Sequence, residues 1–566
     1  MRSLLKSSLF LMLLFCVPGF TAEFPDFKEL AAGFESIPLP ARPRALWDWV
    51  DGNFSHAEIT RELEAAHTKG MGGFDIWDVA SRVDEQNIVP EGPAFMSEPY
   101  VDAICHALRE AERLGLDIGL IISSGWNAGG VWTAPEHQTM GLFTSLVKVQ
   151  GPGNVQVDLP FPELPDKVGK PGRESEAIIP RQENGDPVFS KEITVLAVSA
   201  TLDSIIPMQR IYDLTDQFKD GRLTWDAPAG DWQIIRTVCA NTGQPMISHT
   251  PNSRGPMIDH FNPEAAAAHL DYFFDKLEAK LGDLSHTALK YLYTDSYEVR
   301  GQLWSPHFLD EFKKRFHYDL APYIPALLGY TVESDEVTRR FLYDYDLFLS
   351  DMIIDGHYKK CREICEQHGI QFVAEAAGPG QPIHNCPFES LKSSGVLSFP
   401  RGEFWQQHRN DEMIDLLQVI KGVASAAHIY DQTFVEAEAF TGTYLWQYGP
   451  GDLKPAADRA FCEGLNRIIF HTWPHTPEAA GEPGWIYSFG TLMHETRAWW
   501  PLADSWMQYL GRCSYLLQQG NFVGDVLYYY GDKAPNFVPA KHMHPELGFG
   551  YDYDVTNRDV LVNRLT

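Results

Sequence analysis

Four short apolar runs in this chain end in carboxylates, and acids in that position can act together on one substrate. The runs are 289–298 with Asp295 and Glu298, 371–375 with Glu375, 396–403 with Glu403, and 433–438 with Glu436 and Glu438. Each run is typical of a buried parallel strand. In a barrel, the carboxyl ends of such strands face a common pocket. Several carboxylates there, without a nucleophile triad, indicate acid/base chemistry on a glycosidic bond.

The spacing of these acids suggests different roles for them. Asp295 and Glu298 would flank the mouth of the pocket, although Asp295 could instead cap a helix beginning near residue 305, or both could simply be solvated. Strand alternation places Glu436 and Glu438 on the same face. Among crowded carboxylates at least one must be protonated, paired with a cation or bound to a metal. Such a site can obtain an acid and a base from similar residues.

Histidines and tryptophans near the ends of other runs are further candidates for binding. His471 and His475 could contact sugar hydroxyls or a metal, or could be structural. Pro474 interrupts any helical zinc motif between them, so an oxygen-rich calcium site is the better expectation. The chain has 15 tryptophans. Those near predicted strand ends are Trp47, Trp49, Trp77, Trp126, Trp405 and Trp473. Each alone is more typical of core packing, but together they favour a carbohydrate cleft.

The elements that must position these residues alternate between strand and helix. Strands are predicted at 44–50, 73–79 and 116–122, with helices at 56–69 and 98–114. This alternation indicates a parallel sheet. Further helices are predicted at 333–368 and 492–518, whereas 144–249 consists of short strands with Pro and Gly turns. The predicted fold class is α/β: a (β/α)8 TIM-like barrel with an inserted antiparallel β domain and the start of a further C-terminal domain.

The predicted division follows from this pattern. It consists of a signal peptide at 1–22, the first part of the barrel at 23–143, the inserted domain at 144–250, the second part of the barrel at 251–519, and an incomplete C-terminal segment at 520–566. Residues 1–22 combine early positive charges, an apolar core and small residues before the cut. We therefore expect a periplasmic or extracellular protein. No other run is long and apolar enough to span a membrane.

Composition and missing motifs exclude several classes of function. The 566 residues carry 76 acidic and 46 basic side chains, a formal net charge of −30, which disfavours nucleic-acid binding and tolerates bound cations. Cysteines are dilute and form no disulfide framework, and Cys361 and Cys365 are expected to pack on a helix. Dinucleotide-binding, P-loop and nucleophile-elbow motifs are missing from the sequence. Nothing in the sequence indicates an oligomeric state.

Several segments, taken in order, form a recognisable set. They are Trp47-Asp-Trp-Val-Asp-Gly-Asn53 with Gly70-Met-Gly-Gly-Phe74, Gly125-Trp-Asn-Ala-Gly-Gly130, Asp295-Ser-Tyr-Glu-Val299 with Trp304-Ser-Pro306, Gly402-Glu-Phe-Trp405, Ala437-Glu-Ala-Phe-Thr441, Asn466-Arg-Ile-Ile-Phe-His471, Tyr509-Leu-Gly-Arg512, Leu516-Leu-Gln-Gln-Gly520 and Asp525-Val-Leu-Tyr-Tyr-Tyr530. The ordered set covers nearly all of the chain after its predicted leader. It resembles glycoside hydrolase family 106, the α-L-rhamnosidases.

The resemblance implies an inverting, calcium-dependent exo-hydrolase that removes terminal α-L-rhamnose from pectic or other plant rhamnosides. Glu298 then corresponds to the general acid and Glu438 to the general base, with Glu436 as the competitor for the base and Asp295 as an essential neighbour of the acid. Glu403 and Glu375 are the expected calcium ligands. The residues expected to bind substrate are Trp49, Asn53, Asp75, Trp126, Trp405, His471 and His475.

Other interpretations remain open at the level of sequence. A barrel glycosidase could act on another sugar, because loops rather than the fold set specificity. A non-catalytic carbohydrate-binding protein derived from a truncated enzyme is a third possibility. Family members usually continue well beyond the point where this chain stops. The chain is therefore expected to be a fragment or a degenerate copy with a complete catalytic barrel.

Overall fold

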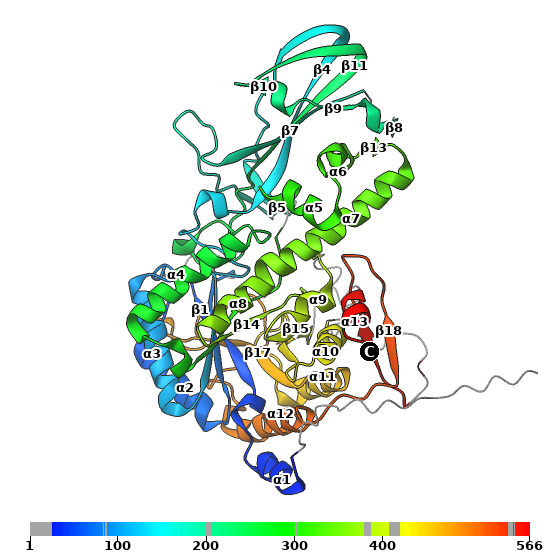
Figure 1. Ribbon diagram of the computed structural model, residues 1–566. Coiled ribbons are helices and arrows are strands. Elements are labelled where there is room, and N and C mark those ends of the chain that lie inside the picture. Colours follow the sequence, from blue (N-terminus) through cyan, green and yellow to red (C-terminus); the bar gives the residue numbers. More distant parts are fainter. Residues whose placement is uncertain are drawn as a thin grey trace, which may run out of the picture.

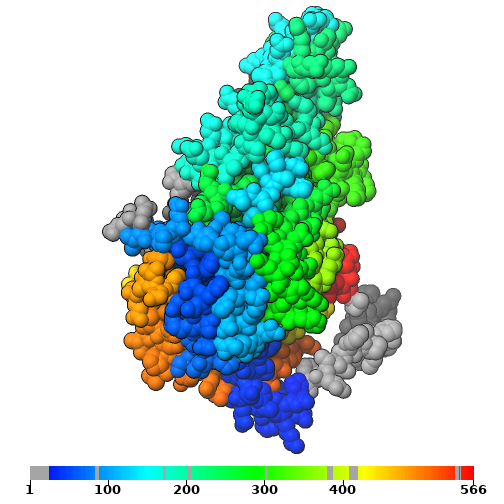
Figure 2. All heavy atoms as spheres, turned by 90° about the vertical axis from the view of Figure 1, so that its left-hand side faces the viewer, coloured from blue at the N-terminus to red at the C-terminus, as the bar shows by residue number. Residues whose placement is uncertain are grey.

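The computed structural model describes residues 25–565, apart from 83, 85–87, 171–172, 200–204, 300–303, 379–385, 407–418, 542–546 and 548–549. Figure 1 shows a barrel surrounded by helices, with a β-rich extension standing on one end of it. Figure 2 shows the same elongated outline from the side. The predicted signal peptide lies outside the described residues. Within the described part, no helix has both the length and the apolar composition needed to cross a membrane.

Eight parallel strands close into a barrel, which confirms the predicted (β/α)8 fold. In order around the barrel they are β1 (Arg44–Val50), β17 (Arg467–Pro474), β16 (Glu436–Thr441), β15 (Phe399–Trp405), β14 (Gln371–Ala374), β12 (Leu289–Thr294), β3 (Asp117–Ile121) and β2 (Gly73–Val79). The first and last strands of the barrel pair in parallel and complete the ring. All eight carboxyl ends therefore lie on one rim, where a barrel carries its site.

Helices cover the outside of the barrel. They are α2 (His56–Thr68), α3 (Glu98–Leu114), α4 (Pro263–Leu281), α7 (Asp335–Ile353), α8 (Lys360–Gln367), α9 (Ser390–Gly395), α10 (Ile420–Ile429), α11 (Pro450–Glu463) and α12 (Ala503–Leu517). The sequence predicted α3 with its observed bounds, because its apolar face repeats regularly and Gly115 ends it with a φ of 66°. A π-helical turn at Ile354–Lys359 joins α7 to α8. At the N-terminus, α1 (Phe27–Glu35) packs on α12, where the Tyr515 hydroxyl donates to the Glu29 carbonyl at 3.2 Å.

The predicted helix 492–518 is wrong in its first part. The α-helix begins only at Ala503, after a 3₁₀ turn at Trp500–Leu502. Upstream, the Thr496 backbone N–H donates to His494 Nδ1 at 3.2 Å. Such local bonds between side chain and backbone compete with helix formation.

The extension is an antiparallel sheet inserted between β3 and β12. Its strands are β4 (Met140–Asp158), β7 (Ser190–Val198), β9 (Ile211–Asp213), β10 (Phe218–Lys219) and β11 (Arg222–Asn241). Alternating residues such as Trp225, Trp232 and Ile234 form a separate small core. Two smaller pairs accompany the sheet: β5 (Lys167–Lys170) with β6 (Arg173–Glu176), and β8 (Ile205–Ile206) with β13 (Thr331–Val332). Short helices α5 (Phe308–Phe316) and α6 (Ile324–Leu327) follow β12.

The C-terminal segment packs on the side of the barrel. It consists of β18 (Val526–Tyr529), β19 (Tyr553–Thr556) and α13 (Arg558–Asn563). Lys421 on α10 is buried within 3.6 Å of both Asp552 and Asp554, and Ser425 donates to Asp554 at 3.0 Å. Polar contacts therefore attach this segment to α10.

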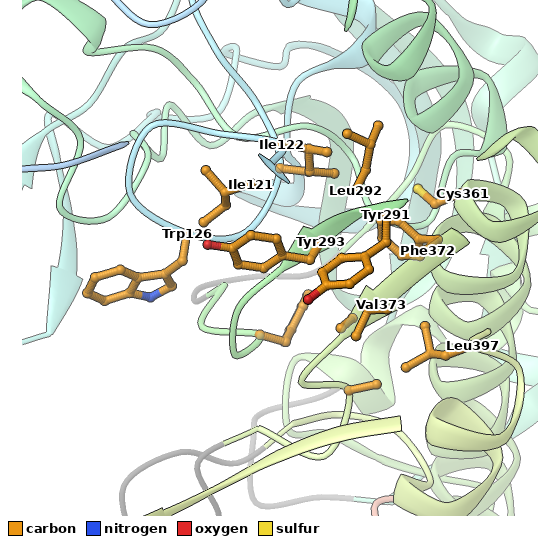
Figure 3. Packing of buried hydrophobic residues seen from close by; sticks show 14 of the residues in the cluster. Ile121, Ile122, Trp126, Tyr291, Leu292, Tyr293, Cys361, Phe372, Val373 and Leu397 are labelled. Atoms are coloured by element: carbon orange, nitrogen blue, oxygen red, sulfur yellow. The ribbon is translucent and has the colours of Figure 1, made fainter. Parts of the chain in front are cut away.

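The barrel interior below the rim is a layer of paired charges. Arg401 donates to Asp75 at 2.6 Å and to Glu436 at 2.7 Å, while Arg44 donates to Asp75 at 2.6 Å. The Tyr291 hydroxyl also donates to Asp75 at 2.7 Å. Figure 3 shows Tyr291 and Tyr293 on one face of β12 and Leu292 on the other, as strand alternation requires. Each buried charge in this layer has an opposite partner, which offsets its desolvation.

Candidate active site

Three carboxylates meet at the rim of the barrel. Asp295 directly follows β12, Glu375 directly follows β14, and Glu438 lies within β16. One carboxylate oxygen from each lies within 4.8 Å of the others. Adjacent strand ends therefore bring together residues that are far apart in sequence.

The pKa values of these acids reflect their crowding. Burial and the charge of Glu438 raise the pKa of Asp295 to about 6. Burial, followed by the charges of Asp295 and Glu438, raises the pKa of Glu375 well above its usual range. Glu403 on β15 shows the same direction, because it is buried and feels Glu438. A proton or a bound cation would relieve this repulsion.

Glu438 differs from its neighbours because an imidazole holds it ionised. His471 Nδ1 lies 2.8 Å from Glu438 Oε1, and the Thr441 hydroxyl donates to the same oxygen. Burial alone would raise the pKa of Glu438, but His471 reverses that effect and lowers it below the usual value. Glu438 in turn raises the pKa of His471 against the effect of burial. Glu438 is therefore suited to accept a proton at the rim.

Glu436 shares a strand face with Glu438, as alternation predicted, but its carboxylate pairs with arginines instead of a histidine. Its side chain is fully buried, with Arg401 Nε at 2.7 Å and Arg467 Nε at 3.2 Å. Two guanidinium groups hold this carboxylate in the charge layer below the rim. Of the two candidates for the base, Glu438 is therefore the one placed among the rim acids.

Glu298 lies in the segment after β12 and is only partly buried. Its backbone N–H donates to Asn127 Oδ1 at 3.0 Å, and the Ser296 hydroxyl donates to its carboxylate at 3.3 Å. The charges of both Glu298 and Glu438 raise the pKa of Glu403. The two predicted catalytic acids therefore act electrostatically on the same pocket residue.

Aromatic rings form a continuous wall beside these acids. The ring centroid of Trp77 lies 6.3 Å from that of Trp126 and 5.1 Å from that of Tyr487. Phe489 lies between Tyr487 and Trp405, with ring-centroid distances of 5.9 Å and 6.1 Å. We call these five residues the aromatic wall. The wall also touches His471, whose ring lies 5.6 Å from Trp77. Trp126 and Trp405, both expected to bind substrate, therefore lie at the site, and Trp405 donates to Glu403 at 2.9 Å.

Four residues expected to bind substrate have other surroundings. Trp49 is fully buried and packs against Phe54 and Tyr100 on the helical side of β1. Both ring nitrogens of His475 are occupied, by Glu62 at 3.0 Å and by the Ser55 N–H at 3.2 Å. The last two are Asn53, which donates to the Pro90 carbonyl at 2.7 Å, and Asp75 of the charge layer. These four side chains therefore make contacts within the protein, away from the three rim acids.

Sequence reasoning missed several residues at this rim. Asp48 on β1 is fully buried, accepts a bond from the Thr472 hydroxyl, and has its pKa raised to about 7 by burial. Alternation places Asp48 opposite to Trp47 and Trp49, a pattern that could have identified it. Thr441, Asn127 and Tyr487 had no such pattern, because loops or strand register bring them to the site.

Comparisons with known proteins agree with this architecture. A family model for glycoside hydrolase family 106, described as alpha-L-rhamnosidase, matches residues 35–203 and 183–566. A Formosa agariphila protein named "Putative beta-glucuronidase" is 31% identical over 555 residues, covering 95% of this chain and 46% of that protein. The structure of a rhamnosidase from Novosphingobium sp. PP1Y superimposes with a TM-score of 0.75 at 23% identity, covering 94% of this chain and 65% of that one. The chain thus spans less than two thirds of either relative, and it belongs to glycoside hydrolase family 106, the α-L-rhamnosidase family.

Proposed function

We propose that this glycosidase removes terminal α-L-rhamnose from pectic or other plant rhamnosides by single displacement with inversion. The observation that carries the proposal is the difference between two acids at one rim. His471 favours the ionised form of the buried Glu438, whereas Glu298 lies in the irregular segment after β12 and is only partly buried. Such a difference in environment is what separates a base from an acid in a glycosidase.

In this mechanism Glu298, protonated, donates to the oxygen of the leaving group. Glu438 takes a proton from a water molecule that attacks the opposite face of the sugar. Before the transfer, His471 Nδ1, 2.8 Å from Glu438 Oε1, favours the ionised form of this carboxylate and orients it. Inversion requires the two carboxyl groups to lie roughly 6.5–9.5 Å apart, so that the water fits between them.

The rim acids suit a hard divalent cation such as calcium. Glu375 Oε2 is a buried oxygen without a hydrogen-bond partner among the described residues, and its neighbours are also carboxylates. Oxygen donors of this kind are those that Ca²⁺ prefers. We propose Asp295 and Glu375 as ligands, with Glu403 beside them and Glu438 able to contribute its second oxygen. When bound, the ion would neutralise the acids and orient vicinal hydroxyls of the sugar.

The substrate would lie between the aromatic wall and the rim acids. Trp126 and Trp405 supply apolar faces for a sugar ring, and His471 Nε2 is a buried nitrogen without a partner among the described residues. We propose these three as substrate contacts. The predicted leader supports export, so we also propose a periplasmic or extracellular location.

The test is hydrolysis of an aryl α-L-rhamnoside by the purified protein, with the anomer of the released sugar followed by NMR. Glu298→Gln and Glu438→Gln should each lower kcat by ~10²–10⁴-fold, the usual contribution of acid/base catalysis. Glu363→Gln, on the exposed face of α8, is a matched control that should leave the rate unchanged. Full activity of both pocket variants would overturn the assigned roles.

A panel of aryl glycosides separates this proposal from its alternatives. The name of the Formosa agariphila relative makes an aryl β-D-glucuronide the first comparison. The rim acids argue against a uronate in the sugar-binding subsite, because its carboxylate would face several like charges. Preferred turnover of the glucuronide would replace the proposed sugar specificity. Binding of sugars without any turnover would indicate a non-catalytic carbohydrate-binding protein.

A further inference from the structure

Arg82 is an exposed cation beside an otherwise acidic pocket. It lies three residues after β2, and its Nη1 donates to the Tyr487 hydroxyl at 3.1 Å. Its guanidinium also lies over the rings of Trp126 at 6.0 Å and Tyr487 at 5.9 Å. Among the residues that the structure describes, Arg82 forms no ion pair with an acidic side chain. Stacking on aromatic rings holds a guanidinium in place while leaving other N–H groups for a ligand.

Neighbouring residues connect Arg82 to Glu298, the proposed general acid. Trp126, beneath the guanidinium, is followed by Asn127, whose side chain accepts from the Glu298 N–H at 3.0 Å. Tyr487, which accepts from Arg82, lies close enough to Glu298 and Asp295 for both charges to raise its pKa, in addition to burial. A general acid lies beside the oxygen of the leaving group. With Glu298 as the proposed general acid, these contacts place Arg82 on the leaving-group side of the scissile bond.

An anionic group on the substrate has one favourable place at this rim. Directly against Asp295, Glu375 and Glu438, a substrate anion would meet like charges. On the side of Arg82 it would meet a guanidinium whose planar N–H groups match a carboxylate in geometry. From this arrangement we propose that Arg82 recognises the carboxylate of a uronic acid in the leaving group, so that the substrate is a rhamnosyl uronate. This inference rests on the rhamnosidase function proposed above.

The kinetic test uses two disaccharides that differ only in the leaving sugar: α-L-rhamnosyl glucuronate and the corresponding rhamnosyl glucose with the same linkage. Arg82→Gln should lower kcat/KM on the uronate about tenfold or more beyond any change on the neutral substrate, since hydrogen bonds to charged groups contribute at this level. The loss should be in KM rather than kcat. Arg82→Lys should recover part of it by retaining the charge. Arg339→Gln, an exposed arginine on α7, is the matched control.

The alternative role for Arg82 is to brace Tyr487 and the aromatic wall. In that case Arg82→Gln would reduce the rates on both disaccharides equally, and the proposal would be wrong. Equal kcat/KM of the wild-type protein on the uronate and neutral substrates would also overturn it.

A binding measurement keeps this inference separate from the proposed function. Methyl β-D-glucuronoside, methyl β-D-glucoside and the 6-sulfate of the glucoside are titrated against tryptophan fluorescence of the wild type and of Arg82→Gln. We expect the uronoside to bind most tightly and to lose that advantage in the variant. Tighter binding of the sulfate ester, or no preference for an anion, would overturn the carboxylate assignment. Selective uronoside binding without turnover of any rhamnoside would contradict only the rhamnosidase function.

Discussion

At the scale of single residues, His471 is the main group that opposes the effect of burial on Glu438. Its imidazole lowers the pKa of Glu438 against the effect of burial. The proposed base is active when ionised, so activity should fall as the pH drops through the pKa of Glu438. His471→Gln removes the imidazole that lowers the pKa of Glu438, and it should move this acidic limb of kcat/KM to higher pH. The measurement is a pH profile on an aryl α-L-rhamnoside, with His67→Gln, an exposed histidine on α2, as the control. An unchanged limb would show that another group sets it.

Glu436 and Glu438 are two residues apart, yet replacing the first should mainly lower stability and replacing the second should mainly lower activity. Glu436→Gln leaves Arg401 and Arg467 without full compensation in the barrel interior. Breaking such a buried pair costs about 3–5 kcal/mol of unfolding free energy. Glu438→Gln should instead retain most of the stability and lose activity. Denaturant unfolding and kcat, measured on both variants, compare the two effects. A stable but inactive Glu436→Gln would return that residue to the role of the base.

At the scale of elements, Glu62 on α2 joins the first and last strands of the barrel. Its buried carboxylate accepts from Trp47 on β1 at 2.6 Å, from Trp473 on β17 at 3.1 Å, and from the Thr476 N–H at 2.9 Å. Burial opposes ionisation, but His475 overcomes it and lowers the pKa of Glu62 well below the ordinary value. One helix thereby fixes the seam at which the ring closes.

Because the pKa of Glu62 is lowered in the folded protein, the stabilisation that it provides depends on pH in a predictable direction. The contribution is fully present above the unfolded-state pKa of about 4.3, and it is lost as the pH falls below that value. Glu62→Gln should therefore lower the unfolding free energy at neutral pH and reduce its decline between about pH 4 and 2. Chemical unfolding at a series of pH values measures both effects. Parallel pH curves for the variant and the wild type would rule out Glu62 as the source.

The bounds of some elements could be predicted from the sequence, whereas contacts between strands could not. The strands β1 and β2 and the helix α3 have their predicted bounds because their hydrophobic periods are clear. The gathering of Asp295, Glu375 and Glu438 followed from the position of acids at strand ends. Roles that depend on register could not be predicted. Arg401, Glu436 and Arg467 are aligned across β15, β16 and β17, and only that alignment shows Glu436 to be paired.

At the scale of the whole molecule, a concentration of negative charge is the main electrostatic feature. The formal net charge is −30, and several carboxylates with raised pKa values lie together at the rim. Like charges in a confined site destabilise the folded state until protons or cations neutralise them. The folded protein should therefore bind calcium more tightly than the unfolded chain does. Stability and ion binding are then linked through the same rim acids.

Calcium should accordingly raise the melting temperature of the protein after treatment with a chelator. A ligand that binds only the folded state contributes about 2.7 kcal/mol at 100 times its dissociation constant. The effect should shrink as the pH falls below about 6, because Asp295, whose pKa is raised to about 6, then carries a proton that competes with the ion. Glu375→Gln should weaken the response, whereas Glu363→Gln on exposed α8 should retain it. Calorimetry at pH 5 and pH 7.5 distinguishes these cases. A calcium response that is equal at both pH values, or that survives Glu375→Gln unchanged, would place the ion away from the rim acids.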